Sequence, residues 1–306
     1  MKSIVRIYLQ SALVLGVGCT PVMAQFGGGP FSGLRDYAKT VTIGIDTPGS
    51  GGSGVIVGKD GNKYYFLTAA HVAASGSPTK EEFWAHSLSS SNDKKYRIER
   101  LWQPKEFAGK DLAIGSFETS DKLEIALVFP VDIEEFVPLP PKLPTDTWSI
   151  AGSMNGREYD KDWDIQGPPI VAGVSLPTGA VQVPLFRVSE ANMQSRANGN
   201  QNGYEAIYAA TSTVPGMSGG GVFAARLCPQ FMHNGRNVWG AYPGLIAIHG
   251  MSESYKESQG RSGVSLGVPL DLVAKYLGKN AKTLGIPIGR AYYDKMIELC
   301  INKGMF

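Results

Sequence analysis

The sequence predicts an all-β protein, built from β-barrels or sandwiches in one compact unit and closed by a helix near the C-terminus. Short apolar runs separated by turn residues recur along most of the chain. The 38 glycines and 19 prolines are too many for a helical protein. Almost no 3.6-residue periodicity occurs before Pro269. With 43% hydrophobic residues, the chain can form a large core.

The strand pattern begins near residue 37. Val41, Ile43 and Ile45 alternate with a polar residue and a glycine, which predicts the first strand. The run at 48–52 interrupts the chain, and residues 59–62 contain the Asp-Gly pair of a hairpin turn, which tolerates the positive φ that such turns require. Further strands are expected at residues 54–58, 63–68, 96–102, 112–117, 125–128, 147–152, 180–186, 206–210, 221–225, 244–248 and 264–268.

Helices are expected only toward the C-terminus. Leu270, Val273, Ala274 and Leu277 share one face of a helix, and a second helix is expected over 290–301. The sequence divides into a signal peptide (1–24), a flexible N-terminal segment (25–36), one domain (37–280) and a helical C-terminal extension (281–306).

The first 24 residues have the character of an export signal. Lys2 and Arg6 precede an apolar run at 7–18 that is too short for a mature membrane anchor. Residues 22–24 then offer small residues at the positions that a signal peptidase reads. We therefore expect an exported protein, periplasmic or extracellular, without stable membrane insertion. Cleavage and lipidation at Cys19 is an alternative.

The charge of the chain restricts the class of binding partner, and its cysteines leave two alternatives. The signal segment contains two of the 29 basic residues and no acidic residue, so 27 of each remain after its removal. A near-neutral surface argues against nucleic acid or an anionic membrane as partner, since both require a concentrated basic patch. Cys228 and Cys300 form either one disulfide, which an exported location permits, or two buried thiols.

Three segments contain the residue types of acyl transfer. His71 follows the expected strand at 63–68, Asp111 opens an apolar run, and Ser218 lies in Pro-Gly-Met-Ser-Gly-Gly. A serine nucleophile requires a base to take its proton and an acid to fix the tautomer of that base. It also requires backbone N–H groups directed at the developing oxyanion, here those of Gly216 and Ser218. No cofactor or metal is needed for this chemistry.

The order of these residues separates the possible serine hydrolases. α/β-Hydrolases have an acid and then a histidine after the serine, and no Asp or Glu lies between Ser218 and His249, the last histidine. A subtilisin order would need Asp46, but the βαβ pattern of a parallel sheet is missing. The order His71, Asp111, Ser218 is that of chymotrypsin.

With these flanking residues, the three segments resemble the signatures of trypsin-like serine peptidases of the bacterial type. The resemblance extends from about Val41 to Leu277 and implies two perpendicular six-stranded antiparallel β-barrels with the triad between them. It also implies a secreted serine endopeptidase that cleaves protein or peptide substrates through an acyl-enzyme. Met217 stands where animal members have an aspartate that pairs with the new N-terminus, so activation by that ion pair is excluded here.

The resemblance also indicates where specificity residues lie. The strand that ends near His249 should line the primary pocket, and Gly250 to Ser252 should pair with the substrate backbone. Ser212 replaces the pocket aspartate of trypsin. Thr213 and His249 resemble the pair with which glutamyl endopeptidases hold a substrate carboxylate, which implies cleavage after Glu or Asp.

Several alternatives remain open. Asp121 and Asp146 are reserve candidates for the acid, and His86 and His233 are expected to be solvated loop residues. A peptide-binding or chaperone-like module on the same fold is the main alternative function, although such proteins usually lose a member of the triad. An esterase on this fold would use the same triad.

Overall fold

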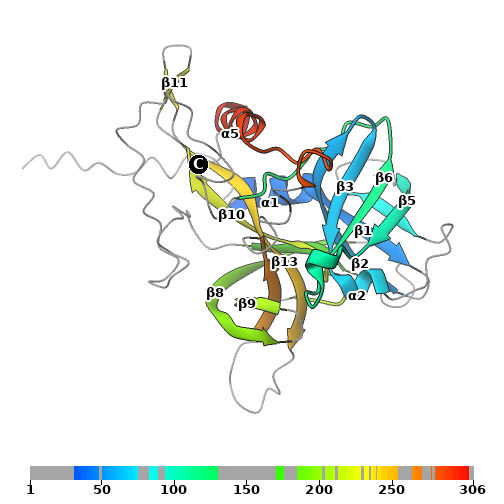
Figure 1. The fold of residues 1–306 in the computed structure, drawn as a ribbon. Coiled ribbons are helices and arrows are strands. Elements are labelled where there is room, and N and C mark those ends of the chain that lie inside the picture. Colours follow the sequence, from blue (N-terminus) through cyan, green and yellow to red (C-terminus); the bar gives the residue numbers. More distant parts are fainter. Residues whose placement is uncertain are drawn as a thin grey trace, which may run out of the picture.

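The mostly β prediction is confirmed by the structure, a computed structural model in which strands make up most of the described chain (Figure 1). The structure describes residues 31–47, 50–74, 83–88, 94–129, 170–175, 185–201, 204–210, 213–228, 231–233, 236–238, 240–253, 264–270, 277 and 280–302. Within these ranges, no helix combines the length and apolar character that a bilayer span requires.

Six strands of the N-terminal half form a closed barrel in the order β1-β2-β3-β6-β5-β4, with β4 pairing back onto β1. Phe117 stacks against Tyr64 and Tyr96 in its core, with ring centroids 5.8 and 5.1 Å apart. The expected break at 48–52 is partly wrong, because Gly51 and Gly52 pair with β1 inside a strand. The strands are β1 Thr42–Thr47, β2 Ser50–Asp60, β3 Lys63–Thr68, β4 Trp84–Ser87, β5 Lys95–Trp102 and β6 Ala113–Glu118.

A second sheet contains six strands in the order β10-β13-β14-β9-β8-β7, and β7 also pairs with β10, so this ring closes. A two-stranded ribbon, β11 with β12, lies apart from it (Figure 1). The expected strand at 147–152 lies outside the described residues. The strands are β7 Ile170–Ser175, β8 Leu185–Gln201, β9 Tyr204–Ala210, β10 Gly221–Leu227, β11 Phe231–His233, β12 Arg236–Val238, β13 Ala241–Glu253 and β14 Val264–Pro269.

The segment before β1 corrects the prediction of a flexible stretch over 25–36. Helix α1 spans Phe31–Val41, and residues 25–30 lie outside the described part. The buried side chains of α1 follow the spacing i, i+3, i+4, i+7 of an amphipathic helix, a signal that the adjoining alternation of β1 obscures. They are Leu34, Tyr37, Ala38 and Val41.

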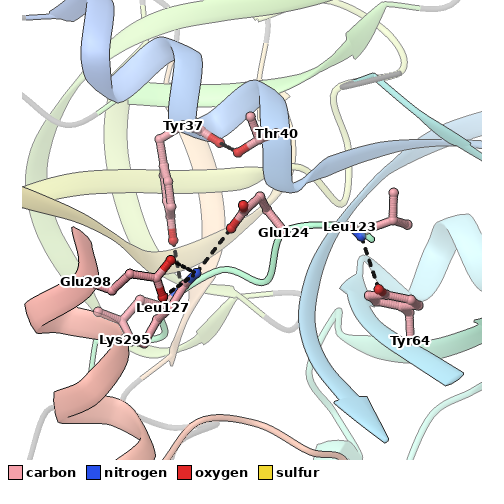
Figure 2. Close-up of polar contacts among 8 residues, drawn as sticks. All are labelled: Tyr37, Thr40, Tyr64, Leu123, Glu124, Leu127, Lys295 and Glu298. Atoms are coloured by element: carbon pink, nitrogen blue, oxygen red, sulfur yellow. Dashed lines mark hydrogen bonds and ion pairs between the residues drawn. The ribbon is translucent and has the colours of Figure 1, made fainter. Parts of the chain in front are cut away.

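The segment that follows β6 forms polar contacts with β3, α1 and the C-terminal helix (Figure 2). The Leu123 N–H donates to the Tyr64 hydroxyl of β3 at 3.1 Å, and the Leu127 N–H donates to the Tyr37 hydroxyl of α1 at 2.7 Å. Glu124 forms an ion pair with Lys295 at 3.2 Å. The sequence predicts a strand over 125–128, but only one isolated bridge forms there, because these backbone groups bond to different elements.

The C-terminal extension contacts both halves of the molecule. The Lys59 N–H of β2 donates to the Gly285 carbonyl at 3.2 Å. The expected C-terminal helix is confirmed as α5, Arg290–Asn302, and its buried side chains recur with helical spacing. Cys228 and Cys300 form a disulfide between the end of β10 and α5, which decides between the two alternatives for these cysteines. The earlier helix is described only at Leu270, Leu277 and Asn280.

Candidate active site

The pairing of β3 with β6 brings His71 and Asp111 together. Thr68, the last residue of β3, lies opposite Ala113, the first residue of β6. In an antiparallel pair, the residues that follow one strand lie beside the residues that precede the other. His71 therefore faces Asp111 across the end of the barrel. It lies on α2, a short helix over Ala70–Ala74.

Two hydrogen bonds join these residues. The His71 backbone N–H donates to Asp111 Oδ1 at 2.9 Å, and His71 Nδ1 lies 2.7 Å from Asp111 Oδ2. The Asp111 side chain is 9% exposed, whereas that of His71 is 48% exposed. A buried carboxylate therefore orients a half-exposed imidazole through Nδ1 and does not engage its other nitrogen, Nε2.

Ser218 lies in a turn that precedes β10. The Met217 N–H donates to the Val214 carbonyl at 3.1 Å, and the Gly220 N–H donates to the Met217 carbonyl at 2.9 Å. Gly216 and Gly219 have φ of 94° and 84°, values that strongly favour glycine. Met217, the residue between Gly216 and Ser218, is fully buried, and its side chain has no carboxylate with which to pair an ammonium group.

The Ser218 turn packs against the segment that carries His71. A Cβ on Gly219 would lie 2.3 Å from Thr68 Oγ1 and 2.9 Å from the Ala69 nitrogen. Only a residue without a side chain permits this approach. The structure thus brings the sequence neighbourhoods of all three predicted residues, His71, Asp111 and Ser218, to one place.

His249 adjoins the same place. The Gly219 N–H donates to the His249 carbonyl at 2.7 Å, and the His249 N–H donates to the Gly220 carbonyl at 2.8 Å. Its side chain is 2% exposed. Burial, reinforced by His71 and opposed by Asp111, lowers the pKa of His249 to about 4. The His249 imidazole is therefore uncharged at neutral pH.

The two edges of β13 differ toward its end. Gly221, the first residue of β10, pairs with Ile248, and beyond it no strand in the described part of the chain pairs with that edge of β13. The opposite edge continues along β14 to Glu253, with a bulge between His249 and Met251. Gly250 and Ser252 lie in this segment.

The remaining predicted pocket residues are only partly placed. Thr213 is half-buried and precedes the Ser218 turn. Ser212 lies outside the described residues. Met251 is 38% exposed beside His249 and Gly250.

The reserve acids and histidines have other partners. The Asp121 carboxylate accepts hydrogen bonds from Lys94 and Tyr96, so it is engaged away from His71, and Asp146 lies outside the described residues. The expectation of a solvated loop is wrong for His86, which is buried in β4 beside Asp46. His233 lies in β11. Among described residues, no group of three or more His, Cys, Asp or Glu could bind a metal.

A comparison with protein families decides the assignment. The sequence model of the trypsin-like peptidase domain matches residues 52–227, more than half of the chain. The chain belongs to the trypsin-like peptidase family. The matched range includes all three residues singled out from the sequence.

No curated protein matches the sequence of this trypsin-like peptidase significantly. Two crystal structures of inactive forms of the Rv3671c protease are similar, one of them a mutant described as from M. tuberculosis H37Rv. Each is 14% identical to this chain, and the alignment covers 91% of the Rv3671c chain in both cases. It covers 82% and 80% of this chain, with TM-scores of 0.43 and 0.42.

Sequence reasoning missed Ser53 of β2, which contacts the Ser218 turn of this trypsin-like peptidase. The Ser53 N–H donates to the Ser218 carbonyl at 2.7 Å. The available signal was a polar residue inside the glycine-rich run at 51–54, directly before apolar β2 residues. Such a serine is commonly a turn residue, so local pattern alone does not reveal the contact.

Proposed function

We propose that this trypsin-like peptidase is an exported serine endopeptidase, with Ser218 as nucleophile, His71 as general base and Asp111 as the residue that orients His71. The observation that carries the proposal is the pair of hydrogen bonds from His71 to buried Asp111, beside the turn that contains Ser218. We take the two six-stranded sheets as the two barrels of the trypsin fold, with the site at their junction.

The hydrogen bonds of Asp111 determine the proton transfers in this proposal. With Nδ1–H donating to Asp111, the lone pair of His71 Nε2 accepts the proton of the Ser218 hydroxyl. The Ser218 oxygen then adds to the substrate carbonyl carbon, and the imidazolium returns its proton to the leaving amine. Water repeats the sequence and hydrolyses the acyl-enzyme.

The N–H groups of Gly216 and Ser218 would stabilise the oxyanion. Neither donates to a backbone carbonyl within the described part of the chain. Two such donors directed at the developing charge commonly make the largest contribution to acyl-transfer catalysis.

A peptide substrate would fit the edge of β13 at Gly250 and Ser252, where no described strand pairs beyond Ile248. An extended peptide can pair there as an added strand, with hydrogen bonds that only a peptide backbone would use. An ester substrate has no use for these bonds, so the edge favours an endopeptidase over an esterase.

The proposed function is tested by labelling the secreted protein with a fluorophosphonate and measuring its intact mass. We expect one label, on Ser218, and a chain that begins at Gln25 or later. The disulfide between Cys228 and Cys300 supports the export part of the proposal, because disulfides persist in oxidising compartments. Lipid on Cys19 would show anchoring instead.

The matched control is Ser218→Ala, which should lose both labelling and peptide hydrolysis while its melting temperature stays near that of the wild type. Hydrolysis by a folded Ser218→Ala protein would refute the proposal. A wild-type protein that binds peptides but neither hydrolyses them nor takes the label would instead be a binding module.

We further propose that the pocket prefers glutamate, or aspartate, on the N-terminal side of the cleaved bond. A carboxylate that leaves water must receive hydrogen bonds in exchange. The buried imidazole of His249 can supply an N–H donor, and the Thr213 hydroxyl a second one. A bound carboxylate would also raise the pKa of His249 from its low value in the free protein and so favour the doubly donating form.

His249→Leu should lower kcat/KM for cleavage after Glu by about ten- to a hundredfold, since losing a hydrogen bond to a charged group costs about 1.5–3 kcal/mol. Cleavage after small apolar residues should change little. His249→Gln, which retains an N–H donor, should recover part of the loss. Profiling against a peptide library measures both variants and the wild type, and a preference for Arg, Phe or Leu with neutral His249 variants would refute the proposal.

A further inference from the structure

Ser53 uses all of its hydrogen-bonding groups while fully buried. Its N–H donates to the Ser218 carbonyl, and its carbonyl accepts from the Thr68 hydroxyl, both at 2.7 Å. Its hydroxyl donates to the Gly216 carbonyl at 2.7 Å and accepts from the Val174 N–H at 2.7 Å. One side chain on β2 of the first barrel thus contacts both β7 of the second sheet and the Ser218 turn.

The two bonds to the turn are made to the carbonyls of the same two residues whose N–H groups are the proposed oxyanion donors. The Gly216 carbonyl is fixed by the Ser53 hydroxyl, and the Ser218 carbonyl by the Ser53 N–H. The Ser218 N–H lies between these two carbonyls along the chain, and the Gly216 N–H directly precedes the first of them. Gly216 has a positive φ and, as a glycine, would otherwise have wide conformational freedom.

The surroundings leave little room for another arrangement. A Cβ on Gly219 would lie 2.1 Å from the Ser53 carbonyl oxygen, and a Cβ on Gly173 would lie 2.9 Å from Ser53 Oγ. The Val174 N–H restricts the direction in which the Ser53 hydroxyl can donate, because that N–H occupies one of its lone pairs. The hydroxyl proton is therefore directed at the Gly216 carbonyl.

We propose that Ser53 is a positioning residue for catalysis: its hydroxyl fixes the Gly216 carbonyl, and with it the turn in which the N–H groups of Gly216 and Ser218 point at the oxyanion. The inference rests on the proposed function, because it assigns a role in the same acyl transfer. Because Ser53 is fully buried, it would not touch the substrate. Its contribution should therefore appear in the transition state rather than in substrate binding.

The test compares Ser53→Ala with Ser116→Ala. Ser116 is a fully buried serine of β6 in the same barrel, and its hydroxyl has no hydrogen-bond partner among the described residues. For the best peptide of a library profile, Ser53→Ala should lower kcat about ten- to a hundredfold, less than the loss of a whole oxyanion donor. KM should change less than about threefold, and Ser116→Ala should retain the wild-type kcat.

A second readout follows the tetrahedral state itself. Phenylboronic acid forms a tetrahedral adduct with a nucleophilic serine, so its affinity for Ser53→Ala should fall by a factor similar to that in kcat. A merely structural serine would lower the melting temperature without separating kcat from KM. Ser53→Cys, which replaces one atom by a weaker donor, should have an intermediate kcat and serves if the alanine variant does not fold.

Two negative results have different meanings. If the wild type neither hydrolyses peptides nor takes the fluorophosphonate label, the proposed function fails. If the wild type is active but Ser53→Ala, or Ser53→Cys where the alanine variant does not fold, retains the kcat of Ser116→Ala, the inference about Ser53 is wrong while the triad stands. A loss confined to KM would also overturn it.

Discussion

Asp111→Asn is expected to lower kcat by about four orders of magnitude with little effect on folding. The reason lies in the two bonds that Asp111 makes to His71. The His71 backbone N–H can only donate, so the amide oxygen of the variant would remain there. Its NH₂ group would then face Nδ1, so Nδ1 must accept and the imidazole proton moves to Nε2. A protonated Nε2 cannot accept the proton of the Ser218 hydroxyl.

His71→Ala should lower kcat by at least as large a factor as Asp111→Asn, because it removes the base itself. The matched control is Asp121→Asn, which alters an aspartate that accepts from Lys94 and Tyr96 and should retain nearly the wild-type kcat. Steady-state kinetics on one peptide, with circular dichroism to verify folding, decides the outcome. An Asp111→Asn variant within tenfold of the wild type would refute the assignment of the acid.

Loss of the disulfide between Cys228 and Cys300 should produce the largest effect on stability. The bond closes a segment with a sequence separation of 72, for which the chain-entropy relation gives about 4 kcal/mol. For a domain of this size, that corresponds to a melting temperature lower by roughly 8–16 °C. We expect this shift in a Cys228→Ser/Cys300→Ser variant and in wild-type protein melted with a thiol reductant.

The double variant is also its own control, since a reductant should not lower its melting temperature further. Its kcat below the melting transition should remain near the wild-type value, because the disulfide joins α5 to the end of β10 opposite to the end that follows Ser218. A wild-type protein whose melting temperature is unaffected by a reductant present during unfolding would contradict the prediction.

Much of the candidate site could be predicted from local sequence. The spacing of His71 after an apolar strand, Asp111 before another and Ser218 among glycines depends on neighbours within a few residues. The order of these segments along the chain then excludes the rival serine hydrolases. The C-terminal helix could also be predicted, because helical periodicity is a local property of the sequence.

Helix α1 shows where local interpretation fails although a signal exists. Its buried residues, from Leu34 to Val41, have helical spacing, but the strand alternation of β1 begins directly after them. Two short periodic patterns that adjoin without a turn residue obscure the boundary between them. The tertiary contact of the helix could not be predicted from local sequence, because Tyr37 accepts a hydrogen bond from Leu127, 90 residues later.

The sequence by itself determined the residue types available for acyl transfer, their order and the β-rich character of the chain. Only the tertiary structure decided that the cysteines pair, that His249 is buried and uncharged beside the Ser218 turn, and that Ser53 reaches Gly216 across 163 positions. The physical reason is range. Side-chain periodicity and turn chemistry act over a few residues, whereas burial and long-range hydrogen bonds exist only after distant strands have paired and excluded water.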